Sequence, residues 1–435
     1  MTITFKQTAQ VANISAFSGI GYYGIQRAYV FDPSYPAVLF NYASSSSASY
    51  MGAIIGSSAQ TLFSGAQGYF DDGLFAPPLW WLNAFLCGGC GPCTGSSCLP
   101  AYYAYNASSK SLNTACNIQP SGPTVLTNIL LDFQNQVAYL EYLDSSENLP
   151  IIFSVSFSGL STITNNLQFP SSYSVAYLQP PNAPSGFSVH TAGAVYYNQT
   201  FYIDSNDGSG NYYIWVIPLS SISWSSSVPS SPQAVGTLYQ YLNGGIAGCC
   251  MQGNIYLNYI VTGSLLQAEI LIYSVSGYSS TNYTYSTVGI YSFNPSNNSF
   301  TQLYSISGAN ASSHAVNLGG ILIFAQLLGG SQGSWNIVVS AFDRNLGVYQ
   351  QAQPFNAIVD LKIAQPGYII VFTPGSSSGT VTATIYQVLL DTTPVIQNLS
   401  YSGGSLTGTV VDQTSGNPLA NITVFLIQLA SEGDD

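Results

Sequence analysis

The stretch IYSFNPSNNSFTQLYSI (residues 290–306) carries the clearest structural signal in the chain. Two runs of apolar and aromatic residues flank Asn, Pro and Ser, which is the pattern of a tight turn between two β-strands. Segments of the same form recur along the chain, and we interpret each as an outer hairpin. They are AYVFDPSYPAVLFNY (28–42), YYAYNASSKSLNTACNI (102–118), FSVSFSGLSTITNNL (153–167), IWVIPLSSISWSSS (214–227), VVSAFDRNLGVYQ (338–350) and IYQVLLDTTPVIQNL (385–399).

A second kind of hairpin alternates with the first. It consists of an apolar strand, a two-residue turn rich in Asn, Gly or Pro, and another apolar strand. Examples are residues 129–140, 194–203, 249–260, 316–324 and 362–372, with a poorer copy at 64–70. Helical periodicity is nearly absent, so the sequence predicts an all-β fold.

Seven outer hairpins at a spacing of roughly 50 to 70 residues predict a β-propeller of seven four-stranded blades. The F-N-P-x-x-N-x-F-x-x-L form of residues 293–303 resembles the outer hairpin of kelch-type blades. An N-terminal strand, at residues 2–6 or 10–17, is expected to close the ring by pairing with the last blade. An array of two-sheet sandwiches is the alternative fold.

The end of the chain differs from the repeats. We expect the propeller to occupy residues 1–399 and the Ser/Gly-rich residues 400–407 to form a linker. Residues 408–435 resemble the beginning of a carboxypeptidase-regulatory-like β-sandwich domain, through the pattern G-x-V-x-D-x-x-S-G-x-P-L-x-N-x-x-V. This resemblance implies that the protein continues beyond Asp435, or that these strands pair with another chain.

Charged residues make up only 5% of the chain, whereas about 25% is usual. The net charge of -12 argues against sequence-specific nucleic-acid binding and against docking to an anionic membrane. A fold with few ion pairs loses little stability when acid protonates its carboxylates. The composition therefore indicates an acidic exterior; a Ser/Asn-rich secreted surface is the alternative explanation.

The N-terminus lacks the basic start and apolar run of a signal peptide, and no apolar run reaches 18 residues. A virion protein released with its particle, or a removed signal, would both explain an exterior protein that begins this way. Eight N-x-S/T sequons nevertheless fit a glycosylated exterior protein. The glycosylation candidates are Asn13, Asn106, Asn198, Asn282, Asn297, Asn310, Asn398 and Asn421.

The cysteines form two groups. CGGCGPCTGSSC (87–98) has spacing that suits zinc or an iron–sulfur cluster, but thiolate ligands compete poorly with protons in acid. We therefore favour disulfides and predict no bound metal and no cofactor. An odd total of seven leaves at least one cysteine free or paired with another molecule. The disulfide candidates are Cys87, Cys90, Cys93, Cys98, Cys116, Cys249 and Cys250.

The most apolar stretch is LFAPPLWWLNAFL (74–86). It is either an exposed contact surface for a partner or a plug packed against the blades. The partner-contact candidates in it are Leu74, Phe75, Leu79, Trp80, Trp81 and Phe85.

Signals of catalysis are sparse, and we predict that the protein is not an enzyme. His190 and His314 are the only histidines, and no G-x-S-x-G motif occurs. A glycosidase would need paired carboxylates. SNDGSGNYYIW (205–215) resembles the Asp-box turn of sialidases, but a sialidase also needs three arginines, and the chain has only Arg27 and Arg344. The acidic candidates are Asp71, Asp72, Asp132, Glu141, Asp204, Asp207 and Asp360; a turn at Asp204–Asn206–Asp207 suits calcium or a plain hairpin.

In its low charge, its Tyr/Ser/Asn richness, its N-terminus and its C-terminal motif, the chain resembles the large tail (nozzle) structural protein of spindle-shaped, fusellovirus-like archaeal viruses. The resemblance implies an oligomeric assembly at the virion end, used for host attachment or genome passage. Its partners would be other virion proteins, copies of itself and host surface glycans. The alternatives are a cellular adhesin or surface-layer-associated glycan-binding protein, and a secreted glycan-active enzyme.

Overall fold

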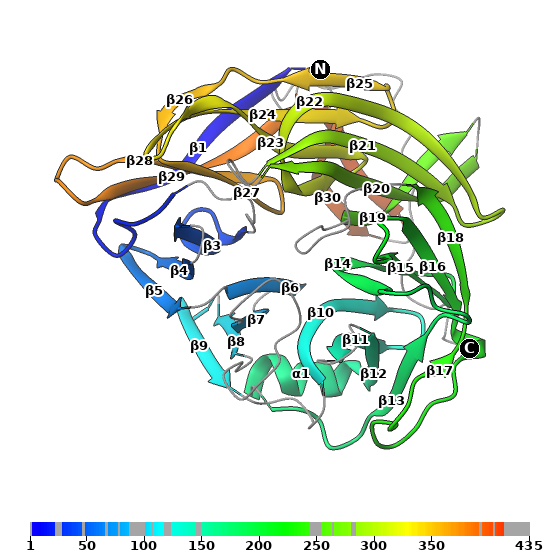
Figure 1. The fold of residues 1–435 in the computed structure, drawn as a ribbon. Helices are drawn as coiled ribbons and strands as arrows, with labels where there is room; N and C mark the ends of the chain where they lie inside the picture. The colour runs from blue at the N-terminus through cyan, green and yellow to red at the C-terminus, as the bar shows by residue number, and fades with distance from the viewer. Residues whose placement is uncertain are drawn as a thin grey trace.

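The computed structural model describes residues 2–21, 28–45, 48–65, 68–76, 79–86, 101–106, 108–116, 123–144, 149–166, 168–243, 254–262, 265–279, 284–390, 394–402 and 405–412. Antiparallel sheets dominate it, and they are arranged around a common centre (Figure 1). The fold is an all-β propeller, as the repeated hairpins predict. In the described part of the chain, neither helix has the length and apolar content needed to cross a bilayer.

The strands divide into seven blades. In each blade the chain runs outward from an inner strand, and each hairpin returns it along the sheet. Blade one contains β2 (Ala28–Asp32), β3 (Ala37–Ser45), β4 (Ala48–Ile55) and β5 (Ser58–Gly65), and blade two contains β6 (Gly68–Ala76), β7 (Leu79–Leu86), β8 (Ala101–Asn106) and β9 (Ser111–Cys116). Blade three contains β10 (Pro123–Asp132), β11 (Val137–Asp144), β12 (Pro150–Ser156) and β13 (Ser174–Gln179), and β17 (Gln233–Ala234) is added at its edge. Blade four contains β14 (Ser188–Tyr197), β15 (Thr200–Asn206), β16 (Tyr212–Pro218) and β18 (Thr237–Leu242).

Blades five and six share one long strand, β22 (Ser299–Leu318). Its first half pairs with β21 and its second half pairs with β23, and a register shift separates the two halves. The remaining strands of these blades are β19 (Asn254–Thr262), β20 (Leu265–Ser279) and β21 (Thr284–Asn294), then β23 (Ile321–Ser331), β24 (Ser334–Asp343), β25 (Val348–Gln351) and β26 (Phe355–Ile358).

The ring closes in the seventh blade. This blade contains β27 (Asp360–Gln365), β28 (Tyr368–Pro374) and β29 (Val381–Leu390), and β1 (Ile3–Ile14) supplies its outer strand. The pairing runs from Ile3 opposite Leu390 to Ile14 opposite Val381. This confirms the predicted closure by an N-terminal strand.

Each described core cluster lies between two consecutive blades. Blade seven shows the arrangement: Leu361 and Ile363 pack toward blade six, whereas Ile370 and Phe372 pack toward blade one. Similar clusters join blades one and two, three and four, four and five, and five and six. A sheet that is buried on both faces needs apolar residues on both, which explains the long apolar runs of these strands.

The hairpin turns follow from local side-chain chemistry. Asp343 Oδ1 accepts hydrogen bonds from the backbone N–H groups of Asn345 and Leu346, at 2.8 and 3.1 Å. Asn294 does the same for Ser296, at 2.9 Å. An Asp or Asn that opens a turn in this way favours the turn before any tertiary contact forms.

Six of the expected hairpins differ from the structure. Residues 64–70 join β5 and β6, which belong to different sheets, and within 249–260 the described strand β19 begins at Asn254 and pairs with β20. Residues 28–42 form inner strands β2 and β3, not an outer hairpin. The outer strand expected in 153–167 is instead the helix α1 (Phe157–Asn166). Ser156 Oγ accepts a hydrogen bond from the Gly159 N–H and caps the helix at its N-terminus. Leu160 and Ile163 form the buried apolar side of the helix, which also stabilises it.

The remaining differences lie elsewhere along the chain. In the segment 214–227, β16 is followed by a short 3-10 helix (Leu219–Ser221), and the outer strand comes later, as β18. In the segment 385–399, β29 does not pair with β30 (Pro394–Ser402). β30 pairs with β31 (Ser405–Asp412) in a separate sheet, so much of the expected linker 400–407 is strand. The β-sandwich motif beyond Asp412 lies outside the described residues.

Candidate interaction face

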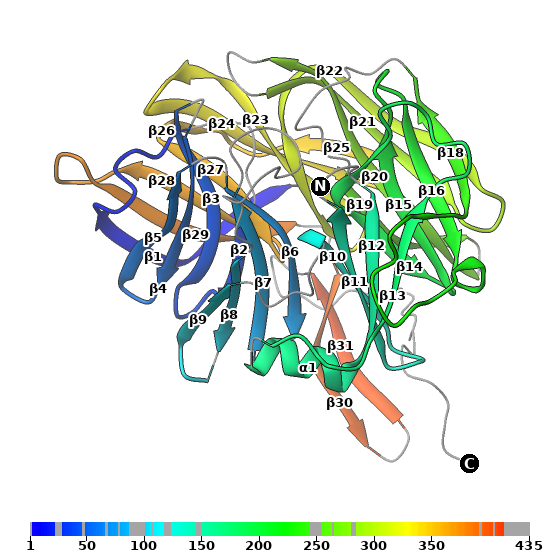
Figure 2. The same ribbon diagram turned by 60° about the horizontal axis from the view of Figure 1, so that its bottom comes forward.

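One face of the ring carries the turns that follow the first and third strands of each blade. These turns share a face because each blade is antiparallel, so every second turn lies at the same end. We call it the hairpin face and define it by the turns at 33–36, 133–136, 198–199, 295–298, 319–320, 344–347 and 366–367. The helix α1 follows a third strand and lies at this face. The hairpin β30–β31 follows β29, also a third strand, and projects below the blades in Figure 2.

Exposed apolar side chains are concentrated on the hairpin face. Seven large apolar residues are exposed among the described ones. Four of them lie on or next to turns of this face, and a fifth, Leu265, begins the second strand of blade five and so lies at the same end. Leu265 and Leu346 are 64% and 58% exposed, so most of their surface contacts water. Of the other two, Leu328 lies near the end of β23, toward the turn on the opposite side of the ring, and Ile396 lies on the β30–β31 hairpin. The five are Tyr35, Phe133, Leu265, Leu346 and Val348.

The apolar residues of this face project from rigid surroundings. Phe133 makes an edge-to-face contact with Phe157 of α1, with ring centroids 5.6 Å apart. The turn that carries Leu346 is held by Asp343, a residue that is 4% exposed. Preorganised side chains lose little entropy on binding, so these positions suit contact with a partner. Single exposed apolar residues are common, but the concentration of five of the seven on one face is informative.

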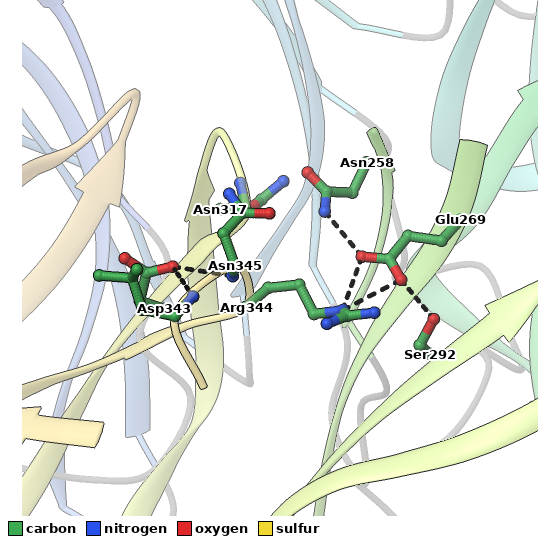
Figure 3. A network of polar contacts seen from close by, with 9 residues as sticks. Asn258, Glu269, Ser292, Asn317, Asp343, Arg344 and Asn345 are labelled. Carbon is green, nitrogen blue, oxygen red and sulfur yellow. Dashed lines mark hydrogen bonds and ion pairs between the residues drawn. The ribbon is translucent and has the colours of Figure 1, made fainter. Parts of the chain in front are cut away.

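Beneath this face, a partly buried ion pair joins blades five and six (Figure 3). Arg344, in the turn after β24, places Nε 3.0 and 3.1 Å from the two carboxylate oxygens of Glu269. Asn258 Nδ2 donates to Oε1 of Glu269 at 2.8 Å, and Ser292 Oγ donates to Oε2 at 2.5 Å. The Arg344 N–H donates to Gly320 O at 2.9 Å, which ties two turns of blade six together. These contacts fix the turn that presents Leu346.

The Asn–Glu pair recurs in the propeller. Asn258 on β19 lies directly opposite Glu269 on β20, and Asn128 on β10 lies directly opposite Glu141 on β11. In both blades the Asn side chain donates to the Glu carboxylate, and both carboxylates are buried. We missed this motif in the sequence. The Asn and the Glu have the same positions relative to the turn between the first two strands in both blades, and this repeated spacing could have revealed the motif in the sequence.

At the inner turn of blade one, Asp32 accepts several hydrogen bonds. Burial by itself would raise its pKa, but hydrogen bonds from Lys110 Nζ, from the Tyr35 N–H and from Ser34 outweigh burial and lower it to about 2. Asp132 and Asp207 follow the same rule. Burial is opposed mainly by Asn135 for the first and by Asn211 for the second, so that both pKa values are lowered. These three carboxylates therefore stay charged to a lower pH than an ordinary Asp.

This chemistry predicts how stability depends on pH. Because the folded-state pKa of Asp32 is about 2 and its unfolded value is 3.8, its contribution is complete above pH 4 and is lost as the pH falls through 2. We expect Asp32→Asn, which keeps a turn-forming oxygen, to lower the free energy of unfolding by about 1 to 2 kcal/mol at pH 6, since the exposed Lys110 is partly screened. The difference should vanish below about pH 2. Urea unfolding at pH 2, 4 and 6 measures it, and an equal difference at all three values would contradict the assignment.

The structure spreads the acidic candidates over several blades. Asp207 accepts hydrogen bonds from Asn211 and from the Ser209 N–H at 2.9 Å, as in an ordinary hairpin turn. Asp204 is buried and accepts a hydrogen bond from Tyr241. Among the described residues, no group of three potential metal ligands comes together. Asp71 and Asp72 lie in β6, whose side chains are outside the described part.

The two histidines lie on inner strands of different blades. His314 is buried, with Nδ1 3.0 Å from Asn254 Oδ1 of the neighbouring blade. His190 lies in β14, and its side chain is outside the described part. The hydrogen bond of His314 therefore joins blades five and six.

The other candidates have varied positions. Asn13, Asn198, Asn297, Asn310 and Asn398 are exposed, whereas Asn106 is half-buried; Asn282 and Asn421 lie outside the described residues. Cys87, Cys90, Cys93, Cys98, Cys249 and Cys250 also lie outside them, and only the backbone of Cys116 is placed, opposite Ala101. Leu74 and Phe75 lie in β6, and Leu79, Trp80, Trp81 and Phe85 lie in β7, so the backbone of these residues forms the first two strands of blade two.

Comparison with known proteins bears on the fold alone. No family model matches the chain, and no curated protein matches it in sequence. The WD40 domain of SCAP from fission yeast is 8% identical and aligns over 83% of this chain and 84% of its own, with a TM-score of 0.38. The β-propeller domain of the Trilobed protease from Pyrococcus furiosus is 8% identical over 81% and 91%, with a TM-score of 0.35. A PL25 ulvan lyase is 10% identical over 88% and 96%, with a TM-score of 0.43. The β-propeller of seven blades is defined by the order of the described strands in this chain itself.

Proposed function

We propose that this protein is a structural and attachment protein on the exterior of a virion and works by contact rather than by catalysis. The observation that carries the proposal is the asymmetry of the ring. Five of the seven exposed large apolar residues in the described part lie on the hairpin face, while Leu328 lies toward the opposite side. A face that carries most of the exposed large apolar side chains suits contact with a partner.

The internal polar contacts support the same proposal. The carboxylates of Asp132 and Asp207 accept hydrogen bonds from neutral donors, and their lowered pKa values keep both groups charged to a lower pH than an ordinary Asp. With charged residues at 5% of the chain, such a scaffold tolerates an acidic medium. The proposed place of action is the tail of an archaeal virus, with copies of the chain and other virion proteins as partners.

The proposal predicts self-association through the hairpin face. We expect the triple variant Phe133→Ser, Leu265→Ser and Leu346→Ser to weaken association about hundredfold, since each side chain contributes roughly 1 kcal/mol or more when buried. The matched control is Leu328→Ser, on the opposite side, which should leave association unchanged. Sedimentation velocity over a range of concentrations, at pH 3 and pH 7, measures both. Equal weakening by the control, or a wild-type chain that stays monomeric, would contradict this assembly mode.

A separate experiment tests the virion assignment. Particles purified from a producing culture are digested and searched for peptides of this chain, and intact cells are examined in the same way. We expect the peptides to copurify with particles. Recovery from the cell envelope alone would instead identify a cellular adhesin.

A further inference from the structure

The inner strand β27 contains a buried ion pair of an unusual kind. Lys362 Nζ lies 2.5 Å from Asp360 Oδ2, and both side chains have no exposed surface. Lys362 is one of only five basic residues in the chain. Within the described residues, neither Nζ nor Oδ2 has a hydrogen-bond partner of good geometry beyond this contact. Two charges buried with so little support are costly.

The pair is fully buried, and its cross-strand neighbours are apolar. Asp360 and Lys362 are two residues apart in a strand, so their side chains share one face of the blade. Leu361 and Ile363 pack toward blade six, which places the pair on the face toward blade one. Directly opposite on β28 lie Phe372 and Ile370, which belong to the cluster between blades seven and one.

Burial favours the uncharged forms of both groups. It raises the pKa of Asp360 to about 6, although Lys362 opposes the rise. It also lowers the pKa of Lys362, although Asp360 opposes this change. A neutral amine is a nucleophile, and a neutral carboxylic acid has a carbon that it can attack.

We propose that Lys362 and Asp360 condense in the folded protein to an amide between Nζ and Cγ, with release of water. The side chains are held in contact, which replaces the encounter that slows this reaction between free molecules. Asp360 Oδ1 already accepts a hydrogen bond from the Leu361 N–H at 2.7 Å, which is placed to stabilise the negative charge that develops on Oδ1.

The atoms balance without an added reagent. The Nζ lone pair attacks Cγ, the C–N bond forms, and Oδ1 takes the electrons of the carbonyl double bond. One proton passes from Nζ to Oδ2, which already carries the acid proton. The Cγ–Oδ2 bond then breaks, water leaves, and the carbonyl at Oδ1 re-forms. The product is an uncharged amide that acid cannot protonate at ordinary pH.

Mass spectrometry of the unglycosylated, reduced chain tests this proposal. Trypsin should release residues 345–435, in which Lys362 is the only site of cleavage. We expect this fragment to stay uncut and to weigh 18 Da less than its sequence mass, with the loss confined to residues 360–362. A fragment of full mass that is cleaved after Lys362 overturns the proposal, and the wild-type chain alone decides this.

Variants separate the amide from a succinimide at Asp360, which also loses 18 Da. Lys362→Met should abolish the loss, and Asp360→Asn should change it to 17 Da, because ammonia leaves instead of water. Lys110, in an exposed pair with Asp32, is the internal control and should show full mass and normal cleavage. A loss of 18 Da that persists in Lys362→Met, or that leaves cleavage after Lys362 intact, contradicts the proposal.

Discussion

Replacing Glu269 by alanine is expected to lower the free energy of unfolding by about 2 to 3 kcal/mol. The change removes the only carboxylate that contacts Arg344 in the described residues and leaves Asn258 and Ser292 without their acceptor. Breaking a fully buried ion pair costs about 3 to 5 kcal/mol, and an exposed pair costs about 1 or less. The Arg344 side chain is 23% exposed, so the expected loss lies between these limits.

Urea unfolding of Glu269→Ala, Arg344→Ala and the double variant measures this prediction. The double-variant cycle isolates the interaction between the two side chains, which should be at least about 1 kcal/mol. Lys110→Met is the matched control, because Lys110 pairs with Asp32 at the surface and should lose about 1 kcal/mol or less. Equal losses for the two sites would mean that the network in Figure 3 does not join the blades.

Deletion of residues 1–14 should have the larger effect and should abolish cooperative folding. The strand β1 pairs along its length with β29, and Thr8 Oγ1 donates to Ile385 O at 3.2 Å. It buries Ile3 and Ile14, and Phe5 packs against Phe355 at a centroid distance of 5.1 Å. Burying such side chains contributes about 1.5 to 3 kcal/mol each, and the total approaches the 5 to 15 kcal/mol that keeps a domain folded.

The matched control removes residues 394–435, which include β30 and β31 but leave the pairing of β1 with β29 intact. This variant should unfold as the full chain does. Thermal unfolding followed by circular dichroism compares the three proteins. A synthetic peptide of residues 1–14, added to the shortened chain, should restore part of the transition. A normal transition without residues 1–14 would show that the ring does not depend on this closure.

Short-range chemistry explains what could be read from the sequence. The hairpin at residues 290–306 lies in β21 and β22, and its turn begins at Asn294, whose side chain accepts a hydrogen bond from Ser296. The repeat predicted a propeller that an N-terminal strand closes, and β1 pairs with β29 as the outer strand of blade seven. Asp and Asn form such turns with their own neighbours in the chain, so the local sequence is sufficient to predict them.

The position of a hairpin within a blade required the tertiary structure. Residues 28–42 have the local form of an outer hairpin, yet β2 pairs with β27 at the inner edge. Inner and outer hairpins use the same turn chemistry, and only their neighbours in space distinguish them. The helix α1 was missed because ten residues give too short a period to stand out among strands.

The sequence by itself determined the class of fold, the turns and the low charge, because strand pattern, turn residues and composition act over a few neighbouring residues. The tertiary structure alone decided which side chains meet and which face water. Glu269 and Arg344 lie 75 positions apart in the chain. The hydropathy of the sequence did not predict that Leu265 and Leu346 would be exposed. Burial and partnership depend on residues that are distant in the chain, so they exist only once the ring has closed.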